Sequence, residues 1–243
     1  MTTTSSKSPS PKTSSTTSKL RHPALRGLAA GLGAGLLVVL AAGLNPLAAS
    51  DRPALALLAV TLSLPLGAVL ARRPSDVRDA GGVGLAALVA ALGLAVCVSL
   101  FEPALFVRTA SWCVAAALLG ASVGSVGRNA GVAVTALWLL LCGLPFFYWK
   151  LPAFTATAES WALQGCPWLG FAQDAVGGDP LRRPVLYLGH WSQLSGATGL
   201  GMLEASTLWL AAVPAFAALI VTSMGGLNRE QTENPAVVER AGA

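Results

Sequence analysis

Charge is what this 243-residue sequence has least of: only 11% of its residues are Asp, Glu, Lys or Arg, whereas about 25% is usual for a soluble domain. Hydrophobic residues make up 54% of the chain, and the mean hydropathy is +0.64. A single small core cannot bury this much apolar surface, so the composition excludes an ordinary soluble domain and predicts a multi-pass membrane protein. The net charge of +5 lies mostly in the N-terminal segment and in short loops, so no nucleic-acid partner is expected.

Familiar catalytic motifs are missing as well. The sequence contains no HExxH, no Walker GxxxxGK[ST], no GxSxG and no Rossmann glycine fingerprint. The centres of the apolar runs hold essentially no ionisable residues, although such residues usually mark ion paths and proton relays. We therefore expect neither an enzyme nor a proton-coupled pump, and we expect no cofactor. Any ATPase motor must be a separate chain.

The four cysteines show neither CxxC spacing nor a framework of close pairs. Free cysteine behaves as a small hydrophobe, so buried thiols packed between helices are the simplest interpretation. Neither a disulfide framework nor a zinc site is expected. Cysteine labelling should report topology, with Cys166 reacting from outside the cell. The cysteines are Cys97, Cys113, Cys142 and Cys166.

Six apolar runs have the roughly 20-residue length that a helix needs to cross a bilayer. Lipid offers no partner to exposed backbone groups, so isolated runs can span it only as helices. The predicted fold class is an all-α polytopic membrane helix bundle of about six transmembrane helices, with short interfacial helices between the fifth and the sixth. The runs are Gly27–Leu44, Ala54–Ala71, Gly81–Phe101, Thr109–Val126, Gly131–Trp149 and Ala205–Met224.

The expected organisation has five parts. The first is rich in Ser, Thr, Lys and Pro, a composition that cannot bury enough apolar surface to become ordered. An alternative is that the first run belongs to a signal peptide cleaved near Ala49. The run is longer than the 7–15 residues of a typical signal-peptide core, which favours an uncleaved helix. The parts are a disordered tail (1–26), five transmembrane helices (27–149), an extracytoplasmic interfacial segment (150–204), the sixth helix (205–224) and a second tail (225–243).

Orientation follows from the positive-inside rule. Of the 16 Lys and Arg residues, eleven fall on the side that holds both termini, and five fall on the other side. Both termini are therefore predicted to be cytoplasmic, in the inner membrane of a bacterial-type cell. The segment 150–204 is then the one substantial feature outside the cell.

Two lines of glycines at four-residue spacing allow helix backbones to approach closely. Packing within the bundle is the favoured interpretation, and a homo-oligomer face remains open. Pro65, Pro145 and Pro214 lie inside the second, fifth and sixth runs, where each removes a helix hydrogen bond and favours a kink. The glycines are Gly27, Gly31, Gly35, Gly120 and Gly124.

Within the extracytoplasmic segment, Trp168–Val176 is predicted to form a short helix that follows Pro167. Its apolar residues recur at helical spacing and share one face, whereas Gln173 and Asp174 lie opposite. The pair Gly177-Gly178 supplies the geometry that ends a helix. The apolar face comprises Trp168, Phe171, Ala172 and Ala175.

Polar residues of the same segment suggest three kinds of site. Arg182 and Arg183 are suited to a lipid phosphate or an anionic substrate, because a guanidinium binds phosphate in a bidentate way. A local salt bridge with Asp179 or Asp174 is the simpler interpretation. His190 and Ser192 resemble a base and a nucleophile, but no motif accompanies them. A metal site formed by His190, Cys166, Asp174 and Asp179 lacks any ligand-spacing signature, so no metal is expected.

The six runs with both ends cytoplasmic, and the short helices between the fifth and the sixth, resemble the membrane-spanning permease subunit of ABC-type exporters. The resemblance covers Leu28 to Met224 and concerns architecture. It implies an interface helix before the first span, and a coupling helix between the second and third spans that docks on a separate ATPase. The docking loop would be Arg72–Asp79, with Arg72, Arg73 and Arg78 as contact residues.

The function expected from the sequence is therefore a permease-like subunit of a transporter that a separate cytoplasmic ATPase drives. Membrane lipids are the other expected partner. The alternative is a non-transporting structural or assembly subunit, which would hold other membrane subunits through its small-residue faces.

Overall fold

The computed structural model describes residues 23–44, 53–147, 164–176 and 203–233. Within these ranges every regular element is a helix, and no strand occurs. The elements are α1 (Pro23–Leu44), α2 (Pro53–Leu70), α3 (Val77–Ser99), the 3-10 turn η2 (Pro103–Leu105), α4 (Phe106–Val126), α5 (Arg128–Phe147), α7 (Pro167–Val176) and α8 (Ala205–Glu233).

Four of these helices are long and apolar enough to cross a membrane, which indicates a membrane location. Two further helices, α2 and α5, contain shorter apolar stretches, Ala54–Leu70 and Arg128–Gly143. The four longer stretches are Pro23–Leu40, Val77–Ser99, Pro103–Val126 and Ala205–Met224.

The helix boundaries follow local sequence signals. Proline occupies the first position of α1, α2 and α7, where its missing N–H costs nothing. Asp76 caps α3, because its side chain accepts a hydrogen bond from the backbone N–H of Asp79 at 2.6 Å. Gly127 separates α4 from α5.

Three boundaries differ from the sequence prediction by four residues or more, and one of them is the start of α3, at Val77 rather than Gly81. Residues 23–26, which were expected in the first tail, form the first turn of α1. The last helix continues to Glu233, so residues 225–233 are helical rather than part of a tail. The proline at position 214 lies inside α8, which continues past it.

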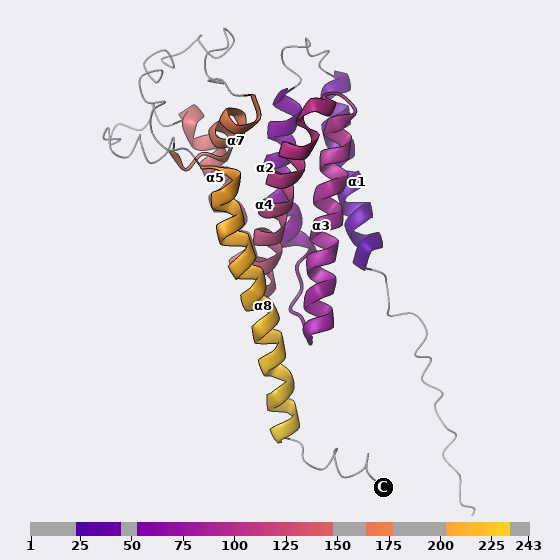
Figure 1. The fold of residues 1–243 in the computed structure, drawn as a ribbon, viewed down its shortest axis with the longest axis vertical. Coiled ribbons are helices and arrows are strands. Elements are labelled where there is room, and N and C mark those ends of the chain that lie inside the picture. Colours follow the sequence, from indigo (N-terminus) through magenta and orange to yellow (C-terminus); the bar gives the residue numbers. More distant parts are fainter. Residues whose placement is uncertain (1–22, 45–52, 148–163, 177–202, 234–243) are drawn as a thin grey trace, which may run out of the picture.

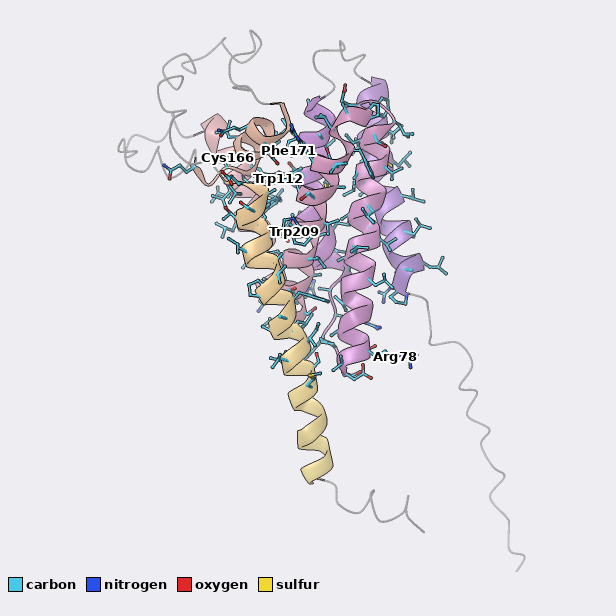
Figure 2. All side chains as sticks on the ribbon, viewed as in Figure 1. Arg78, Trp112, Cys166, Phe171 and Trp209 are labelled. Carbon is cyan, nitrogen blue, oxygen red and sulfur yellow. The ribbon has the colours of Figure 1, made fainter. Side chains whose placement is uncertain are left out.

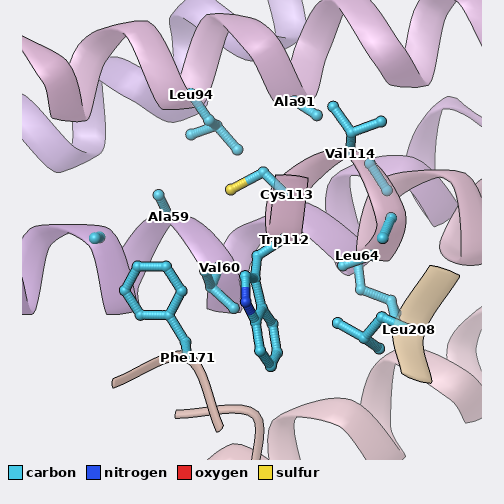
Figure 3. Close-up of a cluster of buried hydrophobic side chains, with 14 of the residues drawn as sticks. Ala59, Val60, Leu64, Ala91, Leu94, Trp112, Cys113, Val114, Phe171 and Leu208 are labelled. Carbon is cyan, nitrogen blue, oxygen red and sulfur yellow. The ribbon is translucent and has the colours of Figure 1, made fainter. Parts of the chain in front are cut away.

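Long helices that follow one another in the chain run in opposite directions, so that α1 and α3 are parallel, as are α2 and α4, and α4 lies at the centre of the bundle (Figure 1). The closest helix pairs are α1 with α3 and α2 with α4, and α4 also packs against α3, α5 and α8. The buried core gathers around Trp112, with Val60 and Leu64 of α2 beside it and Phe171 of α7 nearby (Figure 3).

Both predicted lines of glycines face neighbouring helices of the same chain. In α1 they lie on α3: a Cβ at Gly31 would come within 2.6 Å of the carbonyl oxygen of Ala90. In α4 they lie on α2: a Cβ at Gly124 would come within 2.7 Å of the Cβ of Ala71. The remaining members make equally close approaches, Gly27 to Ala86, Gly35 to Cys97 and Gly120 to Leu64.

Charged residues gather at the two ends of the bundle. The end where α3 begins carries Arg78, and the opposite end carries Trp112, Cys166 and Phe171 (Figure 2). Apart from the polar last part of α8, the described arginines at the first end outnumber its two acids, whereas the second end holds three acids and one arginine. We call the first the basic end, with Arg26, Arg72, Arg73, Arg78, Arg128, Asp76 and Asp79, and the second the α7 end, with Arg108, Glu102, Asp174 and Glu204.

Candidate functional site

The α7 helix covers one end of the bundle, where it contacts α2, α4, α5 and α8 (Figure 1). Its inward face is the predicted one, because Phe171, Ala172 and Ala175 are buried while Gln173 and Asp174 are exposed. The short helix predicted from apolar spacing is therefore confirmed as a helix with that face inward. Its position relative to a membrane interface stays a prediction.

Phe171 and Gly170 bring α7 against α4 and the start of α8. The Phe171 ring meets the Trp112 indole edge to face, with ring centroids 5.9 Å apart. A Cβ at Gly170 would clash with the carbonyl oxygen of Leu203 and would lie 3.0 Å from the Trp112 ring. Only glycine therefore allows these three segments to approach so closely.

Two side chains of α4, one turn apart, hold the last turn of α7. The Trp112 indole donates a hydrogen bond to a carboxylate oxygen of Asp174 at 2.9 Å. The Arg108 guanidinium donates to the carbonyl oxygen of Ala175 at 2.5 Å. A cation at a helix C-terminus also interacts favourably with the helix dipole, so Arg108 both satisfies a terminal carbonyl and stabilises the helix end.

The Thr61 residue of α2 accepts hydrogen bonds from two indoles. Its hydroxyl accepts from Trp168 of α7 at 2.5 Å while donating to its own helix at Leu57. Its carbonyl oxygen accepts from Trp138 of α5 at 3.2 Å. That carbonyl is free because the residue four positions later is Pro65, which has no N–H to donate. The proline in α2 therefore creates the acceptor that ties α5 to α2.

Two further hydrogen bonds complete this end of the bundle. The Trp209 indole of α8 donates to the Ser111 hydroxyl of α4 at 3.0 Å. The Leu203 N–H donates to the Gln164 carbonyl oxygen at 2.9 Å. Gln164, which precedes α7, and Leu203, which precedes α8, therefore lie side by side.

Most of the predicted site residues of the extracytoplasmic segment lie outside the described residues. These are Asp179, Arg182, Arg183, His190 and Ser192. The two remaining members of the hypothetical metal set are described, and Asp174 bonds to Trp112. Among the described residues, no group of three His, Cys, Asp or Glu side chains can hold a metal ion.

The expectation that Cys166 labels from outside is corrected by its burial. Its exposed fraction is 0%. Burial also raises the pKa of the Cys166 thiol to about 11, so little of the reactive thiolate forms at neutral pH. Cys166 is therefore a poor probe of topology.

The predicted docking loop between α2 and α3 is short and internally bonded. No separate helix stands between Leu70 and Val77. Arg72 forms an ion pair with Asp79 at 2.9 Å, and the Ser75 hydroxyl donates to the other oxygen of the Asp79 carboxylate at 2.6 Å. The Ser75 hydrogen bond, and to a smaller extent the Arg72 charge, hold the pKa of Asp79 below its usual value.

The loop leaves two of its three predicted contact residues exposed. Arg73 and Arg78 face solvent in the described part of the chain, and Arg72 is engaged with Asp79. The implied interface helix before α1 would fall on residues that the structure does not describe.

The indole hydrogen bonds at the α7 end were not predicted from the sequence. The spacing of Thr61 and Pro65 was the available signal, because it marks a carbonyl that needs a donor from another helix.

No protein-family model matches this chain, and no curated protein or solved structure matches it either.

Proposed function

We propose that the chain is a six-span membrane protein with both termini in the cytoplasm, and that it serves as the permease-like subunit of a transporter driven by a separate ATPase. The observation that carries the proposal is the arrangement of the two ends of the bundle. Exposed arginines gather at the end where α1 and α3 begin, and α7 covers the opposite end between α5 and α8.

The charge distribution supports the orientation. An excess of arginine is typical of cytoplasmic ends, which supports a cytoplasmic location for the basic end. The α2 and α5 helices, with the apolar stretches Ala54–Leu70 and Arg128–Gly143, count as two further spans in this arrangement.

The absence of charge inside the helices supports an external source of energy. Among the described residues, every Asp, Glu, Lys and Arg of the helices lies in a terminal turn or in the polar last part of α8. Ionisable groups within the membrane form the proton relays of proton-driven pumps. Transport by this bundle would therefore depend on conformational work done at its cytoplasmic end.

The α7 cap is suited to a gate. It meets α2 and α4 through two tryptophan hydrogen bonds, one arginine hydrogen bond and one aromatic pair. Individual hydrogen bonds between membrane helices contribute only about 0.6 kcal/mol on average. Detachment of the cap would break these bonds and expose its buried apolar face, while the contacts among the long helices stay in place.

The alternative of an assembly subunit rested on the small-residue faces. Those faces are covered inside the chain, since the α1 glycines lie on α3 and the α4 glycines lie on α2. No observation on the described residues favours this alternative over the transporter.

Co-purification tests the proposal. The tagged full chain should retain a nucleotide-binding chain when it is extracted from its native membrane in a mild detergent. Replacing Arg73 and Arg78 by alanine should release that partner, whereas Arg128→Ala, at the same end but outside the loop, should not. Absence of any ATPase from the preparation, or retention of it by the double variant, would refute the permease function.

A further inference from the structure

A crevice opens at the basic end where α1, α2 and α3 meet. Its apolar floor is formed by Leu70, Val83 and Ala86, and two guanidinium groups, those of Arg26 and Arg72, stand at its edge. Gly82 lines the crevice, and a Cβ there would meet only Pro23, at an ordinary contact distance of 3.6 Å, so the position has room for a side chain that points into the crevice. The crevice is therefore a basic-rimmed, apolar-floored space between three helices.

The two arginines differ in their partners. Arg26 is exposed and makes no ion pair or hydrogen bond with any residue that the structure describes. Arg72 is half exposed and pairs with Asp79, which lies in the first turn of α3. One acid for two guanidiniums leaves the rim with an excess positive charge, which suits a phosphate group.

An exposed apolar stripe on α3 begins one turn beyond Gly82. Its side chains recur at intervals of three and four residues and therefore share one face of the helix. An acyl chain can lie along this stripe while its headgroup stays at the arginines. The stripe consists of Leu85, Leu88, Leu92 and Val96.

We infer that this crevice binds the phosphate of an anionic phospholipid of the cytoplasmic leaflet, with an acyl chain along the α3 stripe. The inference rests on the proposed orientation, which places the basic end at the cytoplasmic headgroups. Basic pockets between membrane helices on that side commonly hold anionic headgroups. Free phosphate satisfies the same guanidiniums, but it makes no use of the apolar floor and stripe.

Native mass spectrometry of the full chain in a neutral detergent tests the site. Phosphatidylglycerol and phosphatidylcholine with identical acyl chains are the two probes, and phosphatidylglycerol should be retained preferentially. Arg26→Gln and Arg72→Gln should each lower its retention about fivefold, the effect of one basic residue near anionic lipid. Arg128→Gln, at the same end but outside the crevice, is the matched control and should change nothing.

Two variants separate lipid binding from a general charge effect. Gly82→Leu keeps every charge but fills the crevice, so it should also reduce phosphatidylglycerol retention. Asp79→Asn frees Arg72 from its ion pair, so it should increase retention, whereas a purely structural role for that pair predicts a decrease. Retention unaffected by Gly82→Leu, or lowered equally by Arg128→Gln, would overturn the site.

The source of the phosphate and the orientation are tested separately. Displacement of phosphatidylglycerol by millimolar inorganic phosphate would mean that the crevice takes a soluble anion, and would refute the lipid. The measurement is made in detergent and is independent of topology. A reversed topology with intact lipid retention would contradict the proposed function alone.

Discussion

The Gly31→Ala substitution in α1 probes the close packing of this bundle most directly. The added Cβ would lie 2.6 Å from the carbonyl oxygen of Ala90 and 2.8 Å from its Cα. Carbon and carbonyl oxygen ordinarily approach to about 3.3 Å, so α1 and α3 must separate by roughly 0.7 Å. Backbone atoms cannot rotate away, and overpacking of this kind costs about 1–3 kcal/mol.

Gly33→Ala is the matched control, two residues along the same helix. A Cβ at this position meets nothing within 4 Å. Both substitutions gain the same helix propensity, about 1 kcal/mol, so the difference between the two variants isolates packing. We expect Gly31→Ala to be less stable than Gly33→Ala by about 1–3 kcal/mol, which corresponds to about 5-fold to 150-fold in the unfolding equilibrium.

The free energy of unfolding can be measured by titrating the purified protein in mild detergent micelles with SDS and following tryptophan fluorescence. Gly31→Ala should unfold at lower SDS than the parent chain, and Gly33→Ala at the same or higher SDS. Equal midpoints for the two variants would refute the close contact between α1 and α3.

Three further predictions concern the α7 end and the loop between α2 and α3. Thr61→Val removes the acceptor of the Trp168 indole and should lower the free energy of unfolding by about 1 kcal/mol, whereas Thr222→Val, which loses only bonds within its own helix, should not. Gly170→Ala should loosen α7, seen as faster proteolysis beyond Val176, because its Cβ clashes with the carbonyl oxygen of Leu203; unchanged proteolysis would contradict the packing. The pKa of Asp79 is lowered by the Ser75 hydrogen bond, so its stabilising contribution is complete above the usual value of 3.8 and is lost as the pH falls through the lowered pKa. The free energy of unfolding of Asp79→Asn should therefore fall less below about pH 4 than that of the parent chain. An equal fall in both proteins would count against the ion pair.

Local signals allowed much of the fold to be predicted. The starts of α2, α5 and α8 lie within three residues of the predicted ones, because prolines, glycines and apolar runs mark them in the sequence. The inward face of α7 was predicted from the spacing of Phe171, Ala172 and Ala175. These features depend on neighbours within two helical turns, which a sequence displays directly.

Features that join distant segments were not predictable in the same way. Glycine spacing indicated close packing, but not that the α1 line meets α3 and the α4 line meets α2. The free carbonyl of Thr61 follows from Pro65, yet its donor, Trp138, is 77 residues away. The extension of α8 to Glu233 was missed because its last part is polar, and the burial of Cys166 was missed because it depends on the helices that α7 covers.

The orientation of α4 tests the central claim most directly. Val107 and Val126 lie at opposite ends of this helix and are 75% and 76% exposed, and all four native cysteines are buried. In intact cells, a membrane-impermeant maleimide should label Val107→Cys, while Val126→Cys should label only after permeabilisation. Labelling of Val126→Cys alone in intact cells would show that the topology is the reverse of the proposed one. Labelling of both variants in intact cells would show that α4 does not span the membrane.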